Sequence, residues 1–125
     1  MVDSERQLAA LDLGSNSFHL LVAQESNGRL QVVDRIKEMV RLAAGLSKDK
    51  TLSADVMTRA LECLDRFSQR LRGLAPEDIR VVGTSTLRRA SNAQMFLDEA
   101  ERILGTKVEI ISGREEARLI YLGVS

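Results

Sequence analysis

LAALDLGSNSFHLLV, residues 8–22, carries the first indication of the fold. It holds two apolar runs, Leu8–Leu13 and Phe18–Val22, on either side of the polar segment Gly14-Ser-Asn-Ser17. Two short apolar runs separated by turn-forming residues are typical of a β-hairpin. The segment therefore predicts that the chain opens with two antiparallel strands.

A second turn signal follows the hairpin. Asn27-Gly28 is the strongest two-residue hairpin signal in the chain. It predicts a third strand from Arg29 to about Glu38, with Leu30, Val32 and Val33 packing. The residues from Ala43 to Thr51 then indicate a loop.

The apolar period changes to that of a helix after this loop. Ser53 is a suitable N-cap, Asp55 suits the first turn, and Gly73 followed by Pro76 ends the pattern. The predicted apolar face consists of Val56, Met57, Ala60, Leu61, Leu64, Phe67 and Leu71.

The rest of the chain alternates between strand and helix patterns. We expect a strand over Ile79–Ser85, a helix between the caps Asn92 and Gly105, a short strand over Val108–Ile111, and a last helix from Ser112 to about Leu122. The order β-β-β-α-β-α-β-α predicts an α/β domain with one mixed sheet and helices on its faces. The later crossovers are expected to be right-handed.

Length and composition exclude several protein classes. A chain of 125 residues with 44% hydrophobic and 29% charged residues suits a single globular domain, residues 1–125. No apolar run is long enough for a membrane-spanning helix. Eighteen basic residues balance eighteen acidic ones, and aromatic residues make up only 3%. We therefore expect neither an electrostatic field that would hold a nucleic-acid duplex nor an aromatic platform for stacking bases. For these reasons we predict no nucleic-acid binding.

Cys63 and His19 are the single cysteine and the single histidine. A disulfide within the chain and a Cys/His zinc cluster are thereby excluded, and a cytoplasmic location is expected. Cys63 lies near the apolar face of the first helix and His19 on a strand, so both are interpreted as structural and a Cys–His dyad is not expected. Three arginines of the first helix are interpreted as a solvated face: Arg66, Arg70 and Arg72.

The first candidate site is the segment Asp12-Leu-Gly-Ser-Asn-Ser17 at the end of the first strand. A turn of small residues brings backbone N–H groups together, and such groups bind anions. Ser15, Asn16 and Ser17 add side-chain donors, and Asp12 is suited to hold a metal ion or its water. The same pattern is also typical of a plain hairpin turn, so the residues alone leave both interpretations open.

The second candidate site is Gly83-Thr-Ser-Thr-Leu-Arg-Arg89, where a strand delivers hydroxyl groups and two arginines. The planar arginine fork suits phosphate. Arg88 and Arg89 are adjacent, so at most one is expected to face a given site. A hydroxyl-rich loop with solvated arginines fits the pattern equally well.

The third candidate site is Ser112-Gly-Arg-Glu-Glu116. Ser-x-x-Glu is a capping box, which gives Glu115 a structural role at the start of the last helix. Glu116 has no such role and lies in line with Ile120, beside a predicted packing stripe. A carboxylate in that position suits a general base, although an ordinary first-turn acid is the plainer interpretation.

Four blocks together are more specific than any one site. DLGSNSFHLLVA (12–23), RLAAGL (41–46), GTSTLRRASNA (83–93) and EIISGREEARLIYLGV (109–124) resemble the N-terminal domain of the exopolyphosphatase/guanosine pentaphosphate phosphatase family, Ppx/GppA. The resemblance runs from about Leu8 to Val124. It implies a ribonuclease-H-like fold of the actin/sugar-kinase/heat-shock-chaperone superfamily, with a phosphate-binding cleft between two domains.

The resemblance also implies roles for particular residues. Asp12 to Ser17 matches the first phosphate loop, so phosphate-binding roles fall on Gly14, Ser15, Asn16 and Ser17. Arg88 matches an arginine that contacts phosphate, and Glu116 matches the glutamate thought to activate water. Glu115 matches the residue next to that glutamate in the family. Magnesium is the implied cofactor, with Asp12 in a supporting position, directly or through water.

One part of the family pattern is missing. A second glycine-rich phosphate loop, Asp-Ile-Gly-Gly-Gly-Ser-like, is absent from the sequence up to Ser125. We therefore expect this chain to be the N-terminal half of a two-domain phosphatase, inactive alone, that forms a homodimer at full length. The expected activity is magnesium-dependent removal of the terminal phosphate from inorganic polyphosphate, with guanosine pentaphosphate as the alternative substrate. A sugar-kinase- or actin-like nucleotide-binding domain, or a non-catalytic phosphate sensor, is the alternative of another class.

Overall fold

The first three strands form an antiparallel meander, as the turn signals predict. The structure, a computed structural model, describes residues 6–111. β1 (Arg6–Leu13), β2 (Phe18–Ser26) and β3 (Arg29–Glu38) pair in sequence order. The turn between β2 and β3 has positive φ angles at both Asn27 (54°) and Gly28 (81°), as a tight hairpin turn requires.

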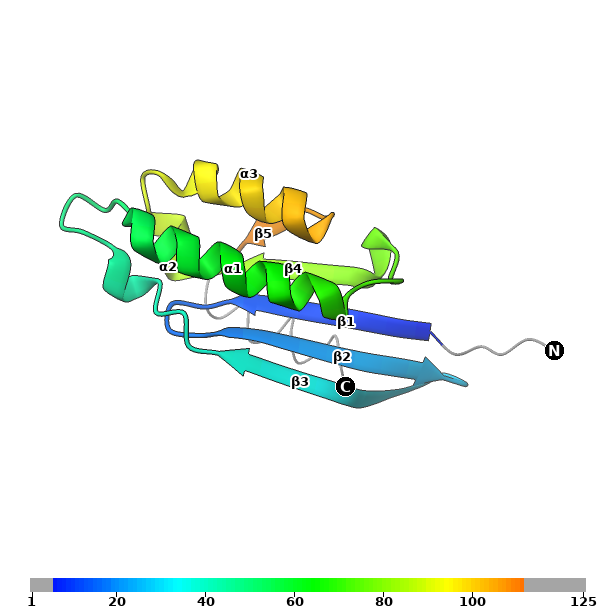
Figure 1. Cartoon of the computed structure of the whole chain (residues 1–125). Coiled ribbons are helices and arrows are strands. Elements are labelled where there is room, and N and C mark those ends of the chain that lie inside the picture. Colours follow the sequence, from blue (N-terminus) through cyan, green and yellow to red (C-terminus); the bar gives the residue numbers. More distant parts are fainter. Residues whose placement is uncertain (1–5, 112–125) are drawn as a thin grey trace.

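Two parallel strands complete the sheet on the other side of β1. β4 (Ile79–Gly83) pairs with β1, and β5 (Val108–Ile110) pairs with β4. The strand order is therefore β3-β2-β1-β4-β5 (Figure 1). Because β1, β4 and β5 run in the same direction, their carboxyl ends meet at one edge of the sheet, where Leu13 pairs with Gly83 and Gly83 with Ile110. The predicted mixed sheet is confirmed.

Two helices cover one face of this sheet. α1 (Ala54–Arg70) and α3 (Ala93–Leu104) lie side by side above it (Figure 1). The three phenylalanines are at most 1% exposed between the layers: Phe18, Phe67 and Phe96. The order of β1 to β5, α1 and α3 matches the prediction, whereas a short helix between β4 and α3 was not predicted. The helix expected from Ser112 lies outside the described residues.

The predicted boundaries of α1 are confirmed. The hydroxyl oxygen of Ser53 accepts a hydrogen bond from the backbone N–H of Val56 at 3.1 Å, which caps the helix. Gly73 follows the helix with a φ angle of 89°, a conformation that favours glycine. Two short 3-10 helices lie in the connections, η1 (Ala43–Gly45) and η2 (Pro76–Asp78).

Asn92 occupies the N-cap position of α3, but its side chain does not cap the helix. Its Oδ1 instead accepts from the backbone N–H of Leu52 at 2.9 Å, and its Nδ2 donates to the Leu52 carbonyl at 3.1 Å. The prediction of a side-chain cap was wrong because two backbone groups 40 residues away occupy the amide. Asn92 therefore ties the start of α3 to the segment that precedes α1.

The strand predicted over Ile79–Ser85 is shorter than expected. β4 ends at Gly83, and residues Ser85–Arg89 form a one-turn helix, α2. Leu87 is 3% exposed, and a Cβ atom on Gly83 would lie only 2.9 Å from its Cδ1. Packing of Leu87 back over Gly83 thus turns the chain into a helix where the sequence suggested extended backbone and a loop.

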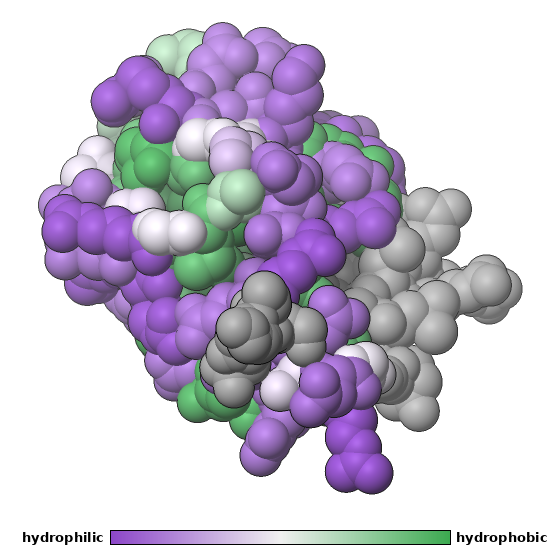
Figure 2. Space-filling view, turned by 90° about the vertical axis from the view of Figure 1, so that its right-hand side faces the viewer, coloured by the Kyte–Doolittle hydropathy of each residue, from purple (hydrophilic) through white to green (hydrophobic). Residues whose placement is uncertain are grey.

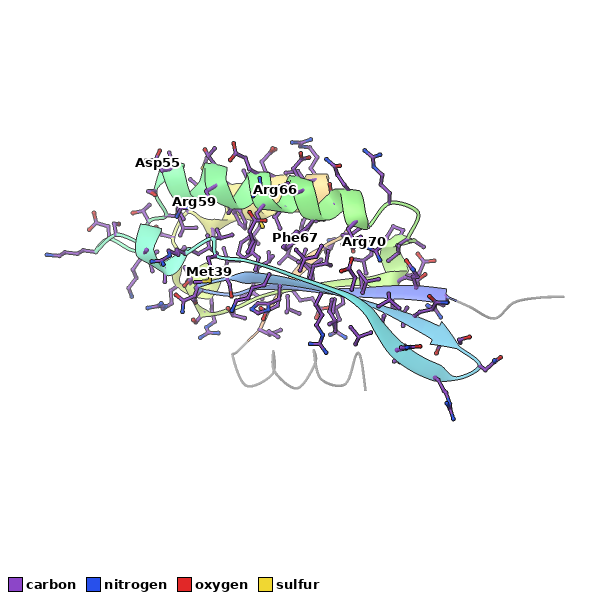
Figure 3. The ribbon with its side chains drawn as sticks, turned by 60° about the horizontal axis from the view of Figure 1, so that its bottom comes forward. Met39, Asp55, Arg59, Arg66, Phe67 and Arg70 are labelled. Atoms are coloured by element: carbon purple, nitrogen blue, oxygen red, sulfur yellow. The ribbon has the colours of Figure 1, made fainter. Side chains whose placement is uncertain are left out.

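Two arginines of α1 interact with β3 and are not simply solvated. Arg66 forms an ion pair with Glu38, and the Nε of Arg70 lies 2.8 Å from Oδ2 of Asp34. Figure 3 shows these arginines on the part of α1 that also carries Phe67. Arg66 is exposed as expected, whereas Arg70 is half-buried, so the solvated face was wrong for Arg70. Both arginines bind carboxylates of β3, Glu38 and Asp34, that lie on one side of this strand.

Val33 is exposed, at 45%, although the pattern suggested that it packs. The pairing of β2 with β3 shifts by one residue between Val22 and Ala23, whose partners are Asp34 and Val32. This irregularity leaves Val33 without a partner in the ladder, as a β-bulge does. Val32 and Leu30 are half-buried as expected.

Candidate functional site

The first two candidate segments lie next to each other at the carboxyl edge of the sheet. β1 delivers Asp12 and the turn 14–17 to this edge, and β4 delivers α2. Leu13 pairs with Gly83 in the parallel ladder, so the two segments leave the sheet side by side. In open α/β sheets this edge is where ligands bind. The structure therefore brings together two of the three sites that the sequence predicts.

The turn 14–17 is tightly closed. The backbone N–H of Gly14 donates to the carbonyl of Ser17 at 3.1 Å, so it is not available to an anion. A Cβ atom on Gly14 would lie 2.9 Å from that same carbonyl oxygen, closer than side-chain carbons come to backbone. Gly14 thus allows the backbone to approach the Ser17 carbonyl closely. Ser15 and Asn16, which follow it, lie at the tip of the turn.

Hydroxyl groups connect this turn to α2. Oγ1 of Thr86 donates to Oγ of Ser15 at 2.7 Å, and Oγ of Ser15 lies 3.2 Å from Oγ of Ser85. Thr86 is only 1% exposed. The hydroxyl of Thr84, at the same junction, donates to the carbonyl of Leu13 at 3.4 Å, so it contacts the end of β1 and not the turn. The sequence placed the hydroxyls of residues 84–86 in one loop but did not reveal their partners.

A third segment supports the turn from its other side. The backbone N–H of Arg41 donates to the carbonyl of Asn16, and that of Ala43 to the carbonyl of Ser15, both at 2.9 Å. The guanidinium of Arg59 on α1 holds this segment by donating to the Val40 carbonyl at 3.0 and 2.8 Å. Figure 3 labels Arg59 on α1, at the same end as Met39. The only sequence signal for this support is the RLAAGL block of the resemblance.

Asp12 carries a buried carboxylate oxygen. Its Oδ1 is buried and makes no hydrogen bond within the part of the chain that the structure describes. Leu11 and Leu13 on either side belong to the core, so Asp12 projects from the opposite face of β1. A buried carboxylate oxygen without a donor is costly unless a cation or further donors satisfy it. Asp12 therefore fits a cation bound at this edge.

Arg88 and Arg89 differ in their contacts. Both belong to α2 and both are exposed. Nη1 of Arg88 donates to the carbonyl of Ile111 at 3.0 Å, directly beyond β5, whereas Nε of Arg89 lies 3.4 Å from the carbonyl of Ser85 in its own helix. Arg88 thus reaches toward the shared carboxyl edge of the sheet. Neither guanidinium forms an ion pair within residues 6–111.

The remaining site predictions divide into two groups. Glu115 and Glu116 lie outside the described residues, so their roles stay predictions.

Burial and the neighbouring Glu38 carboxylate raise the pKa of the Cys63 thiol to about 12, which keeps it protonated at neutral pH. His19 is exposed on β2, with Nε2 2.9 Å from the Ser17 hydroxyl. The interpretation of Cys63 as an inert core residue is therefore confirmed.

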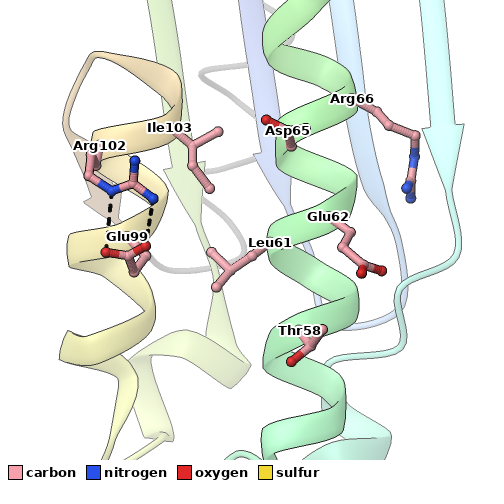
Figure 4. A pocket seen from close by; sticks show the side chains of 8 residues that line it. All are labelled: Thr58, Leu61, Glu62, Asp65, Arg66, Glu99, Arg102 and Ile103. Carbon is pink, nitrogen blue, oxygen red and sulfur yellow. Dashed lines mark hydrogen bonds and ion pairs between the residues drawn. The ribbon is translucent and has the colours of Figure 1, made fainter.

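A hollow of the surface lies away from this edge. A groove of about 890 Å³ runs between α1 and α3 (Figure 4); its lining residues are Thr58, Leu61, Glu62, Asp65, Arg66, Glu99, Arg102 and Ile103. Glu99 and Arg102 pair with each other there at 2.7 Å.

The end of the sheet where β1 begins is mostly hydrophilic, with small hydrophobic patches (Figure 2). Among the described residues no cluster of three or more potential metal ligands of the His, Cys, Asp and Glu types occurs.

Comparison with known proteins gives consistent matches. A model of the Ppx/GppA phosphatase family matches residues 21–125. Guanosine-5'-triphosphate,3'-diphosphate pyrophosphatases from two strains of Aliivibrio fischeri, MJ11 and ATCC 700601 / ES114, are each 53% identical to this chain over 117 residues. The match covers 94% of this chain and 24% of each relative. The chain thus spans about a quarter of the length of these relatives.

Solved structures confirm the expected ribonuclease-H-like α/β fold. A Ppx/GppA family member from Aquifex aeolicus matches with a TM-score of 0.84 and 27% identity, over 94% of this chain and 39% of that chain. An exopolyphosphatase from Cytophaga hutchinsonii matches with a TM-score of 0.82 and 31% identity, over 93% of this chain and 37% of that chain. None of the described helices is long and apolar enough to cross a membrane.

Proposed function

Since this chain belongs to the Ppx/GppA phosphatase family, we propose that it forms the phosphate-binding half of the cleft of a phosphoanhydride hydrolase. One observation carries the proposal: the turn 14–17, Asp12 and Arg88 converge on a single edge of the sheet. Donors of two kinds, backbone N–H groups and a guanidinium without an ion-pair partner in residues 6–111, suit a polyanionic substrate. A nucleotide-binding domain of the sugar-kinase or actin type, or a phosphate sensor, is less well supported by the family match.

We place guanosine 5'-triphosphate,3'-diphosphate first as the substrate and inorganic polyphosphate second. The two relatives at 53% identity carry the name of the guanosine compound. The exopolyphosphatase structure is more distant, at 31% identity. Both compounds present a terminal phosphoanhydride, so the same turn and arginine serve either one. The sequence alone favoured polyphosphate, and the ranking changes because of these identities.

The proposed contribution of this chain is electrostatic. In phosphoryl transfer, charge spreads over the oxygens of the transferred group, and catalysis consists mainly of positioning and charge stabilisation. The tip of the turn, at Ser15 and Asn16, donates to these oxygens, and the guanidinium of Arg88 contacts them from α2. Glu116 orients the attacking water and accepts its proton. These roles rest on the family match and on the geometry of the turn.

Magnesium is the proposed cofactor, with Asp12 as a supporting ligand. The Oδ1 of Asp12, which is buried and has no hydrogen-bond partner among residues 6–111, fits this role. Magnesium is bound in proteins through one or two carboxylates together with substrate phosphates and water, so a single carboxylate from this chain is adequate. When bound, the ion neutralises charge on the phosphates. The homodimer expected at full length stays a prediction.

Amide NMR spectra of the isolated chain, recorded during titration with tripolyphosphate and magnesium, test the proposal. We expect the largest shifts at the turn 14–17 and at Arg88, since both lie at the same edge. Glu62 and Arg102 in the groove between α1 and α3 serve as internal controls and should not move. Shifts confined to that groove, or no shifts at millimolar tripolyphosphate, would contradict the assignment of the site.

A further inference from the structure

We propose that Thr86 is a positioning residue of the phosphate turn, which directs the hydroxyl proton of Ser15 toward the bound phosphoryl group. The inference rests on the proposed function, because it assigns a donor within the same site. Thr86 itself does not reach the ligand. It acts through the 2.7 Å hydrogen bond between its Oγ1 and Oγ of Ser15.

The bond joins two segments that are 71 residues apart in sequence. A threonine at a helix start usually bonds to nearby backbone. Thr86 is 1% exposed, and a hydroxyl buried to that degree requires a partner. Within residues 6–111, the only side-chain hydrogen bond of Thr86 is the one to Ser15, at a length typical of a good O–H···O bond. Its geometry therefore holds the turn against α2.

The direction of this bond determines what the Ser15 hydroxyl can do. A hydroxyl has one proton and two lone pairs. Since Oγ of Ser15 accepts from Thr86, its own proton remains for another acceptor. Oγ of Ser85 lies 3.2 Å from Oγ of Ser15, where either hydroxyl can be the donor, and in the proposed arrangement Ser85 accepts this proton. A phosphoryl oxygen is a stronger acceptor and replaces this weak bond, so Ser15 becomes a donor to the ligand.

Thr84 provides a matched comparison at the same junction of β4 and α2. It is 5% exposed, and its hydroxyl contacts the Leu13 carbonyl at 3.4 Å. Replacing either threonine by valine removes one buried hydroxyl at nearly constant volume. Only the change at Thr86 removes a contact to the turn.

The experiment measures two quantities on each variant of the isolated chain: the dissociation constant for tripolyphosphate by NMR titration, and the melting temperature. We expect Thr86→Val to weaken binding about three- to tenfold, the effect of losing one hydrogen bond. Thr86→Ser loses a buried methyl group and melts earlier, but keeps the hydroxyl and binds within about twofold of the wild type. Thr84→Val should bind like the wild type.

A variant at Ser85 tests the proton direction without changing Thr86. Ser85→Ala removes the competing acceptor, so binding should be unchanged or tighter. A loss of more than about threefold in Ser85→Ala would show that the hydroxyl chain does not run from Thr86 through Ser15. This arm remains decisive if Thr86→Val does not fold.

The outcomes separate this inference from the proposed function. Wild-type-like binding by Thr86→Val, or equal losses in Thr86→Val and Thr86→Ser, would overturn the positioning role and leave the site intact. Absence of tripolyphosphate binding by the wild-type chain would overturn the proposed function, and the inference with it. Loss of binding in Thr86→Val with rescue in Thr86→Ser would support both.

Discussion

Arg88 and Arg89 are adjacent in sequence, but their contacts differ. Arg88 reaches the carbonyl beyond β5, and Arg89 lies against its own helix. In an active protein that contains this chain, we predict that Arg88→Ala raises KM and lowers kcat, whereas Arg89→Ala is nearly silent. A lost charge-assisted contact to phosphate costs about 1.5–3 kcal/mol, or roughly ten- to a hundredfold in kcat/KM. Steady-state kinetics on both variants provide the measurement, and equal effects at the two positions would contradict the orientation described for α2.

Substitutions at Glu115 and Glu116 are expected to have different effects in the same type of assay. As the third residue of a capping box, Glu115 can be replaced by glutamine at a cost well under about 1 kcal/mol, with the chemistry largely intact. Glu116→Gln retains size and polarity but cannot accept a proton. It should lower kcat by about 10²–10⁴-fold with little change in melting temperature or KM.

Thermal melts and kinetics in one magnesium buffer test this pair of variants together. If Glu115→Gln abolishes turnover while Glu116→Gln only destabilises the fold, the two roles have been exchanged. Both residues lie outside the described part of the chain, so this prediction depends on the sequence alone.

At the residue scale, the sequence identified side chains of the candidate site but not their hydrogen-bond partners. Asp12 and the turn 14–17 could be predicted because turn formers after an apolar strand are a local pattern. The bond from Thr86 to Ser15 and the support of the turn by Arg59 through the Val40 segment could not. These contacts join positions far apart in sequence, and their geometry exists only after the sheet has formed.

At the scale of elements, α1 is attached to β3 through charge as well as through the core. The hydrogen bond from Arg66 lowers the pKa of the Glu38 carboxyl below its usual range. A carboxyl whose pKa is lower in the folded state stabilises the fold above its unfolded pKa, and this stabilisation is lost as the pH falls through the folded value. The Arg66–Glu38 pair therefore makes the attachment of α1 weaker in acid.

We predict that Glu38→Gln reduces the acid dependence of stability. The wild-type melting temperature should fall between about pH 5 and pH 3, and the variant should fall less over that range. Asp49→Asn, in the exposed loop before α1, is the control and should retain the wild-type slope. Thermal melts across this pH range decide the matter, and identical slopes for Glu38→Gln and wild type would show that the ion pair contributes nothing.

The elements that the sequence predicted well have strong periodic or turn signals. β1 to β3 follow from two turn clusters, and α1 from an apolar stripe between Ser53 and Gly73. α2 was missed because five residues are too few to show a helical period. The packing of Leu87 onto Gly83, which forms it, depends on β4 and β5 being in place.

At the scale of the whole molecule, the proposed phosphate site occupies one edge of the sheet. The turn 14–17, Asp12 and Arg88 lie at an edge of the sheet, and the chain corresponds to about a quarter of the length of its relatives. We propose that this part supplies phosphate contacts but not a complete active site. The isolated chain should therefore fold and bind polyanions without hydrolysing them.

Phosphate release by a chimaera tests this claim most directly. The chimaera carries this chain in place of the 117 matching residues of the 53% identical relative, and is compared with the isolated chain and with the intact relative. We predict release from guanosine 5'-triphosphate,3'-diphosphate within about tenfold of the intact relative, and none by the isolated chain. A folded but inactive chimaera, or robust hydrolysis by a phosphatase-free preparation of the isolated chain, would contradict the account.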